Sequence, residues 1–118
     1  MTTPHTTSYS RGDVVLVPFQ FTDQRLVKRR PALVISSTPY QRGRNEVIIA
    51  ALTSRIRTPL LVGDHLIKGW RQAGLPKPSV ATAILRTVKA SMVIRRLGSV
   101  GAPDVTAIDG QLRKALRL

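Results

Sequence analysis

The sequence predicts a mainly β protein of the α+β class, in which a small antiparallel β-barrel or sheet carries one C-terminal α-helix. Short runs rich in Val and Ile recur along the chain between turn residues, which is typical of β-strands. These runs do not alternate regularly with helical segments, so a parallel sheet is not expected. One segment near the C-terminus has the periodicity of an amphipathic helix. With 118 residues, the chain has the size of one compact domain.

Three strands are predicted in the first half of the chain. Residues 12–19 (GDVVLVPF) form a β-branched run that ends near Pro18. After a polar, basic connection, residues 30–37 (RPALVISS) form the second run, and residues 38–45 are a turn-rich break. Residues 46–54 (EVIIAALTS) form the third run, which closes on two hydroxyl residues. The expected order is strand, long loop, strand, turn and strand.

The second half of the chain predicts three more strands with weaker signals. Residues 60–64 (LLVGD) are expected to form a short fourth strand, and residues 65–74 a loop or a single helical turn. Residues 79–88 (SVATAILRTV) are the fifth strand, and a sixth is expected over residues 93–100.

The helix is predicted over residues 103–118, with Pro103 in the first turn and basic residues in the last. Its apolar face is formed by residues at helical spacing: Val105, Ile108, Leu112 and Leu116. Gly110 inside it costs roughly 1 kcal/mol relative to Ala, which indicates close packing or a frayed end.

The chain is expected to consist of a flexible tail at residues 1–10 and a single domain at residues 11–118. The tail, MTTPHTTSYS, lacks the apolar centre of a signal peptide. There is no cysteine, which excludes disulfides. The longest uncharged apolar stretches are short in comparison with the roughly 20 residues that a membrane-spanning helix needs. We therefore expect a cytoplasmic protein without a membrane partner.

The strongest compositional signal is the formal net charge of +13. Fourteen of the 19 basic residues are arginines, and both halves of the chain carry them, so the folded surface itself should be basic. A guanidinium holds two phosphate oxygens at once and stays protonated at physiological pH. The sequence therefore predicts a nucleic acid as the partner, and the alternative is a basic surface without a specific ligand.

Several catalytic classes are not supported by the residues present. Cleavage of a phosphodiester by two metal ions needs clustered carboxylates, whereas the six acidic residues are scattered along the chain. A pair of catalytic histidines is not expected, because His5 lies in the tail and His65 in a predicted loop. Phosphate-binding and dinucleotide-binding glycine motifs are absent from the sequence. We expect neither a metal ion nor a cofactor.

Two polar groups at predicted strand ends remain: Lys28-Arg29-Arg30 before Pro31, and the pair Thr53-Ser54. Cleavage of RNA by its own 2′-OH needs a cation to hold the phosphorane and groups that move two protons. The residue before a proline is biased toward extended backbone, so Arg30 should be held at a strand start. The alternatives are a solvated basic loop and a hydroxyl bonded to its own backbone.

The order of these blocks resembles the MazF/PemK family of toxin ribonucleases from type II toxin-antitoxin pairs. The resemblance spans residues 11–118, and the blocks that carry it are GDVVLVPFQFTD, KRRPALVIS, IIAALTS, AGLPKPSVATAILRTV, VIRRLGSV and PDVTAID. It implies a barrel similar to SH3 domains and to the CcdB toxins, and a homodimer that binds single-stranded RNA in a basic interface groove. It also implies metal-independent, sequence-specific cleavage that leaves a 2′,3′-cyclic phosphate and inhibits translation.

The same resemblance implies the site residues. The arginine of the family's RP motif falls on Arg30, and the threonine after the third strand falls on Thr53; these two are the predicted catalytic residues. The predicted RNA contacts are Phe19, Gln20, Lys28, Arg29, Ser54 and Ser79. Phe19 and Phe21 stack on an unpaired base in one interpretation and belong to the core in the other. Many family members carry an acidic or amide residue after the segment that corresponds to SVATAILRT, and this chain has none.

The resemblance further implies an acidic, MazE-like antitoxin whose disordered segment occupies the basic groove. Two alternative functions stay open from the residues alone. One is a CcdB-like toxin that poisons a topoisomerase through its C-terminal helix. The other is a non-catalytic RNA-binding barrel, whose binding would weaken steeply with salt and produce no new RNA ends.

Overall fold

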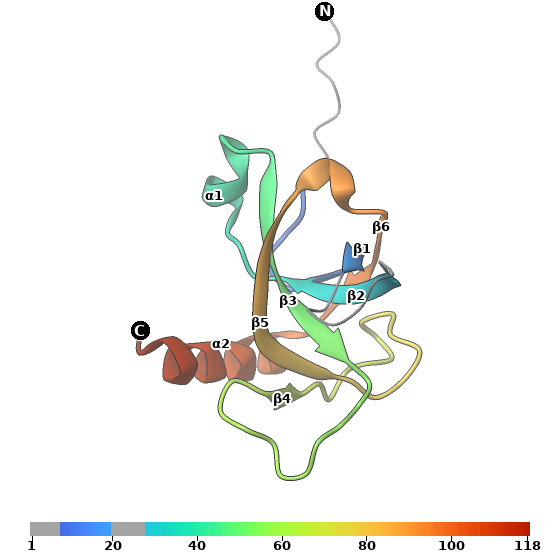
Figure 1. Ribbon diagram of the computed structural model, residues 1–118, viewed down its shortest axis with the longest axis vertical. Coiled ribbons are helices and arrows are strands. Elements are labelled where there is room, and N and C mark those ends of the chain that lie inside the picture. Colours follow the sequence, from blue (N-terminus) through green and yellow to red (C-terminus); the bar gives the residue numbers. More distant parts are fainter. Residues whose placement is uncertain (1–7, 20–27) are drawn as a thin grey trace, which may run out of the picture.

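The protein was studied as a computed structural model, which describes residues 8–19 and 28–118 (Figure 1). Within these residues the elements follow one another in this order: β1 (Asp13–Phe19), β2 (Lys28–Val34), α1 (Thr38–Arg42), β3 (Glu46–Thr53), β4 (His65–Leu66), β5 (Val80–Lys89), the 3-10 turn η1 (Ala90–Met92), β6 (Arg95–Ser99) and α2 (Ala102–Leu116). Neither α-helix has the length and apolar character needed to cross a bilayer.

The strands form one antiparallel sheet in the order β4-β5-β3-β2-β1-β6. The sheet curls into a half-barrel, and α2 packs beside it against β4 and β5 (Figure 1). The predicted fold class, a small antiparallel barrel with a C-terminal helix, is therefore confirmed.

Both faces of the sheet carry a buried cluster, which explains why the strands β1 and β3 are apolar almost throughout. Along β1, Val15, Val17 and Phe19 point to one face and Val14 to the other. We call the face that carries Val15, Val17 and Phe19 the inner face. Across this face Arg86 of β5 reaches the ring of Phe19 in β1, although β3 and β2 lie between these two strands in the sheet. The outer face carries Val14 and packs against α2 and the loop before β5.

Helix α2 confirms most of the predicted apolar face. Ile108 and Leu112 are buried and Val105 is partly buried in the outer core, whereas Leu116 is 50% exposed, because the last turn extends past the sheet (Figure 1). Gly110 meets no atom within 4 Å of an added Cβ and lies five residues or more inside the helix. Neither explanation offered for this glycine, close packing or a frayed end, is correct.

Two local predictions were wrong. The turn-rich segment after β2 contains helix α1, whose first turn holds a proline and whose N-terminus is capped by the hydroxyl of Ser37 accepting from the Tyr40 N–H at 3.3 Å. The strand predicted over residues 60–64 lies instead at residues 65–66, because Asp64 accepts the Leu61 N–H at 3.1 Å and so forms a turn. Tertiary pairing with the end of β5 then selects the two residues that follow.

The folded part begins before the predicted domain boundary. Tyr9 was assigned to the tail, but it is buried in the inner core and its N–H donates to Oε1 of Gln41 at 3.3 Å. Burial, followed by the nearby charge of Asp13, raises the pKa of Tyr9 above its ordinary value. Residues 1–7, the rest of the predicted tail, lie outside the described residues.

Candidate functional site

Arg30 and Thr53 point to the same, inner face of the sheet from the neighbouring strands β2 and β3. The register of β2 with β3 pairs Ala32 with Ala51 and Leu33 with Ala50. The pairing of these two strands ends at Ala32 and Ala51, and Arg30 and Thr53 each lie two residues beyond it. Side chains two residues apart on a strand share a face, so Arg30 shares the inner face with Ala32, and Thr53 shares it with Ala51.

Arg30 is held by the sheet on its β1 side. It is half-buried and pairs with Val17 in the centre of β1. The following Pro31 pairs with Leu16, and a proline disfavours helical backbone in the residue before it. The guanidinium therefore starts from fixed extended backbone, whereas an arginine on a loop would have to be ordered by its ligand.

Thr53 is the last residue of β3 and is half-buried. Its hydroxyl oxygen accepts a hydrogen bond from the Arg55 N–H at 3.1 Å, which fixes the oxygen, and a hydroxyl can still donate its own proton. Thr53 also lines a groove of about 440 Å³ between β5 and the loop after β3, together with Arg55, Arg57, Leu61 and Ile84.

Arg55 and Arg57 were not among the predicted site residues. Both are exposed, and both line the groove that contains Thr53. The sequence does contain a signal for these two arginines, because the block LTS, which includes Thr53, is followed directly by RIRTP. Two arginines spaced by one residue after a strand are able to present two cations to the same polyanion.

The remaining basic and hydroxyl predictions lie close to this site. Lys28 and Arg29 begin β2 and are exposed; Lys28 shares the inner face with Arg30, whereas Arg29 lies on the opposite face. Ser54 follows β3 directly and is exposed. Gln20 lies outside the described residues.

Two predicted RNA contacts are corrected by their burial. The ring of Phe19 is only 3% exposed and belongs to the inner core, so the core interpretation holds and a base is not able to stack on this ring as it stands. Ser79 is 4% exposed and its hydroxyl donates to the Lys77 carbonyl at 2.9 Å. The hydroxyl is thus buried and donates its proton within the protein, so it is not exposed to an RNA ligand.

Three of the acidic residues, Asp13, Asp104 and Asp109, are held by contacts inside the protein. Asp109 pairs with Arg11, and Asp13 is buried and accepts the Ser10 N–H at 2.8 Å. Asp104 is buried at the start of α2, where it accepts hydrogen bonds from the loop before β5. No group of three metal-ligating side chains occurs within residues 8–19 and 28–118. The positive charge of the surface is therefore little offset by exposed carboxylates.

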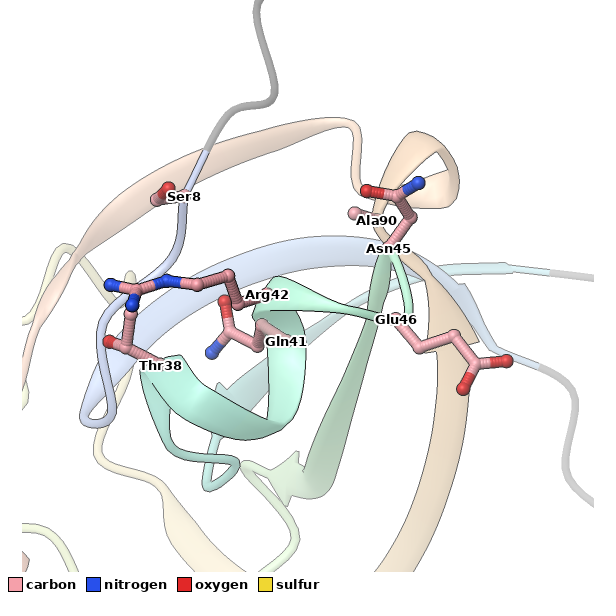
Figure 2. A pocket seen from close by; sticks show the side chains of 7 residues that line it. All are labelled: Ser8, Thr38, Gln41, Arg42, Asn45, Glu46 and Ala90. Carbon is pink, nitrogen blue, oxygen red and sulfur yellow. The ribbon is translucent and has the colours of Figure 1, made fainter.

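A second hollow, of about 190 Å³, lies beside α1 and is lined by none of the predicted site residues (Figure 2). The carboxylate of Glu46 points away from the guanidinium of Arg42 there, so the two side chains do not form a joint binding group (Figure 2). Gln41 in the same hollow donates to the carbonyl of Ser36 and accepts from Tyr9. The contact between Tyr9 and Gln41 therefore holds the N-terminal segment against α1 at this hollow.

Comparison with known proteins identifies the family. Residues 10–116 match the PemK-like, MazF-like toxins of type II toxin-antitoxin systems. The chain belongs to this family. Endoribonuclease MazF6 of Mycobacterium tuberculosis is 36% identical over 94 residues, which cover 77% of this chain and 81% of that protein. Endoribonuclease MazF2 of Mycobacterium bovis matches with the same identity and coverage. The resemblance inferred from the order of the sequence blocks is confirmed.

Solved structures support the fold of this toxin. A mycobacterial endoribonuclease in complex with its cognate antitoxin has a TM-score of 0.75 at 20% identity, over 94% of this chain and 97% of that chain. The MazE-MazF complex of Deinococcus radiodurans has a TM-score of 0.74 at 20% identity, over 93% and 96% of the two chains. At this level of identity, the similarity concerns the arrangement of the half-barrel and its helix.

Proposed function

We propose that this toxin cuts single-stranded RNA at a short sequence, using the RNA's own 2′-OH and no metal ion, and that it inhibits translation in the cytoplasm. Membership of the family makes the chain the toxin component of a type II pair, with endoribonuclease as its activity class. What supports the proposed mechanism is that Arg30 and Thr53 share the inner face, one on each of the neighbouring strands β2 and β3.

The proposed reaction is an in-line displacement at phosphorus. The 2′-oxygen forms a bond to phosphorus and loses its proton, and the bond from phosphorus to the 5′-oxygen of the next nucleotide breaks. The leaving 5′-oxygen takes up a proton. The products are a 2′,3′-cyclic phosphate and a 5′-hydroxyl, so atoms and charge balance without an added water or an oxidant.

In this scheme Arg30 holds the non-bridging oxygens, on which negative charge builds up in the phosphorane, and donates a hydrogen bond toward the leaving oxygen. A guanidinium keeps its proton at any physiological pH, so Arg30 is not the base that activates the 2′-OH. Thr53 orients the phosphate through its hydroxyl, whose oxygen is fixed by the Arg55 N–H. Prepositioned donors of this kind are worth roughly 10²–10³ in rate.

The rest of the RNA would lie over the basic residues around this pair. Lys28 and Ser54 are exposed beside it, and Arg29 is exposed at the same end of β2 on the opposite face. The groove that contains Thr53 has apolar walls for a base, and its charged lining residues are Arg55, Arg57 and Asp64. Gln20 belongs to the same proposed contact set. Phosphate contacts of this kind make binding strongly dependent on salt.

The proposed partners are a second copy of the chain and an acidic antitoxin. Solved relatives were obtained as complexes with an antitoxin, one of them with its cognate antitoxin and another as MazE-MazF. The net charge of +13 and the internal use of three of the acidic residues favour an acidic segment as ligand. Such a segment would block cleavage by occupying the arginines that bind RNA.

The proposal is tested by incubating unstructured RNA with the purified toxin in EDTA and mapping the new ends. We expect cleavage that leaves a cyclic phosphate. Arg30→Ala and Thr53→Val should lower kcat by about 100-fold, because each removes a donor aimed at the reacting phosphate. Arg30→Lys keeps the charge but not the fork and should recover only part of the rate.

Arg113→Ala is the matched control, since Arg113 is an exposed arginine of α2 far along the chain from the proposed pair. It should cut as well as the parent protein. Intact RNA after incubation with folded parent protein would contradict the cleavage proposal. Loss of toxicity on substitution of α2, with Arg30→Ala still toxic, would instead favour a partner bound by the helix, as in a CcdB-like toxin.

A further inference from the structure

Arg86 is a basic residue on the inner face that was not among the predicted site residues and does not line the groove, although it lies in the block AGLPKPSVATAILRTV. It lies in β5 and pairs with Ile49 of β3, whose side chain belongs to the inner core. Paired residues of antiparallel strands point to the same side of the sheet, so Arg86 extends over the inner face. It is exposed, and the ion pairs found within the described residues do not involve it.

The guanidinium of Arg86 is held in place by an aromatic ring of another strand. Its Cζ lies 5.4 Å from the centre of the Phe19 ring, which is within the range of a cation–π contact. Its Nη1 also donates to the Leu85 carbonyl at 3.1 Å. Phe19 is buried in the inner core, so the ring is a fixed support. Because Phe19 is buried, its ring is not available to stack on a base, but the same ring supports the guanidinium of Arg86.

This support brings Arg86 to the end of the sheet where the proposed site begins. Phe19 pairs with Lys28, and Arg30 lies two residues further along the same strand on the same face. Arg86 therefore adds a cation from β5 to those that β2 supplies at the start of the strand. A guanidinium that stacks on a ring keeps its edge free, and the N–H groups on this edge are able to donate two hydrogen bonds to one anion.

We propose that Arg86 binds a backbone phosphate of the RNA next to the one that is cut, and that Phe19 positions it. The inference rests on the proposed function in taking RNA as the ligand. Arg86 is a binding residue in this scheme, distinct from Arg30, which holds the reacting phosphate. It would contribute to the affinity for RNA and to its alignment across the inner face.

The test measures binding separately from cleavage. A fluorescently labelled, fully 2′-O-methylated RNA oligonucleotide carries phosphates and bases but has no 2′-OH to attack. Its anisotropy is titrated with the parent protein, Arg86→Ala, Arg86→Gln and the control Arg95→Ala at several salt concentrations. Arg95 is an exposed arginine on β6 that pairs with Leu16 and so lies on the outer face. Circular dichroism establishes that each variant is folded at the assay temperature.

We expect Arg86→Ala and Arg86→Gln to raise Kd about tenfold, and Arg95→Ala to change it less than about threefold. The slope of log Kd against log salt should become shallower by about 0.7 for Arg86→Ala, because one phosphate contact to a single strand is lost. If Arg86→Gln binds as tightly as Arg95→Ala and keeps the parent slope, Arg86 only covers Phe19 and the inference is overturned. Should Arg86→Ala not fold, Arg86→Gln alone decides, since it keeps most of the side chain without the charge.

Failure of this inference and failure of the proposed function give different results. If the parent protein cuts RNA and Arg86→Gln binds the methylated RNA normally, only the role of Arg86 is wrong. If Arg86→Gln loses binding and folded parent protein cuts no RNA, Arg86 contacts the nucleic acid and the cleavage mechanism is wrong.

Discussion

Asp104 ties the N-terminus of α2 to the loop before β5, and its replacement by Ala gives the sharpest prediction on stability. The side chain is 4% exposed. Its Oδ1 accepts from the Lys68 N–H at 3.0 Å and lies 2.8 Å from Nε2 of His65, and its Oδ2 accepts from the Gly69 N–H at 3.0 Å. The Ala variant leaves these donors without an acceptor.

The magnitude follows from the donors left behind. A buried donor that loses its partner costs about 1–3 kcal/mol, and water that enters the vacated space compensates in part. We expect Asp104→Ala to lower the free energy of unfolding by about 3 kcal/mol. For a chain of this length, 1 kcal/mol corresponds to about 4 °C in Tm, so Tm should fall by about 12 °C. Asp104→Asn keeps the shape and one acceptor and should cost about 2 kcal/mol.

The pH dependence provides a second readout of the same contacts. Burial by itself raises the pKa of Asp104, but the hydrogen bonds from His65, Lys68 and Gly69 outweigh it, so the pKa lies below its ordinary value of 3.8. A carboxyl group whose pKa is lowered by folding stabilises the protein above its unfolded pKa and loses this effect as the pH falls through its folded pKa. The difference in stability between parent and Asp104→Ala should therefore be largest at neutral pH and shrink below about pH 4.

Urea unfolding measures these differences in the free energy of unfolding. Circular dichroism monitors the transition, together with the fluorescence of Trp70, the single tryptophan, which lies in the loop that Asp104 holds. Asp64→Ala is the control, because Asp64 accepts one backbone N–H in a half-exposed turn. It should cost less than about 1 kcal/mol. An Asp104→Ala variant within about 0.5 kcal/mol of the parent at pH 7 would refute the reasoning.

Three further predictions concern stability. Gly110→Ala should raise the free energy of unfolding by about 1 kcal/mol, because a methyl group there meets no atom within 4 Å in the interior of α2; a thermal melt checks this, and a lower Tm would contradict it. Gly74→Ala should unfold the protein or lower its Tm sharply, since φ is +80° and the added Cβ would lie 2.1 Å from the Leu97 carbonyl oxygen. Arg11→Ala removes a part-exposed ion pair with Asp109. It should lower the free energy of unfolding by no more than about 1 kcal/mol at low salt, and by less at high salt. An equal loss at both salt concentrations in urea unfolding would count against an ionic origin.

The strong periodic segments were predictable because burial alone specifies them. The first, third and fifth predicted strands agree with β1, β3 and β5 to within one residue or so at each end, since they are apolar runs of the length that a sheet requires. Helix α2 was predictable for the same reason, together with Pro103 in its first turn. Short elements were not: β4 has two residues and exists only because the end of β5 offers a partner.

The candidate site divides in the same way. The residue types of KRRP and LTS and their place at strand ends indicated Arg30 and Thr53, and the sheet puts both on one face of neighbouring strands. The sequence did not show that Phe19 and Ser79 are buried, because an aromatic or a hydroxyl residue at a strand end occurs both in cores and in ligand sites. Arg86 was invisible in sequence, since its contact with Phe19 joins strands that are not neighbours in the sheet.

By itself the sequence determined the fold class, the basic character of the surface and the family, because these depend on composition, on the order of apolar runs and on motifs along the chain. The tertiary structure decided which cations share a face, which polar groups are spent inside the protein, and where the folded part begins. These properties depend on strand register and on the curl of the sheet, which bring together residues that are distant in sequence. Tyr9 in the core, Asp104 beneath its loop and Arg86 over Phe19 all follow from that geometry.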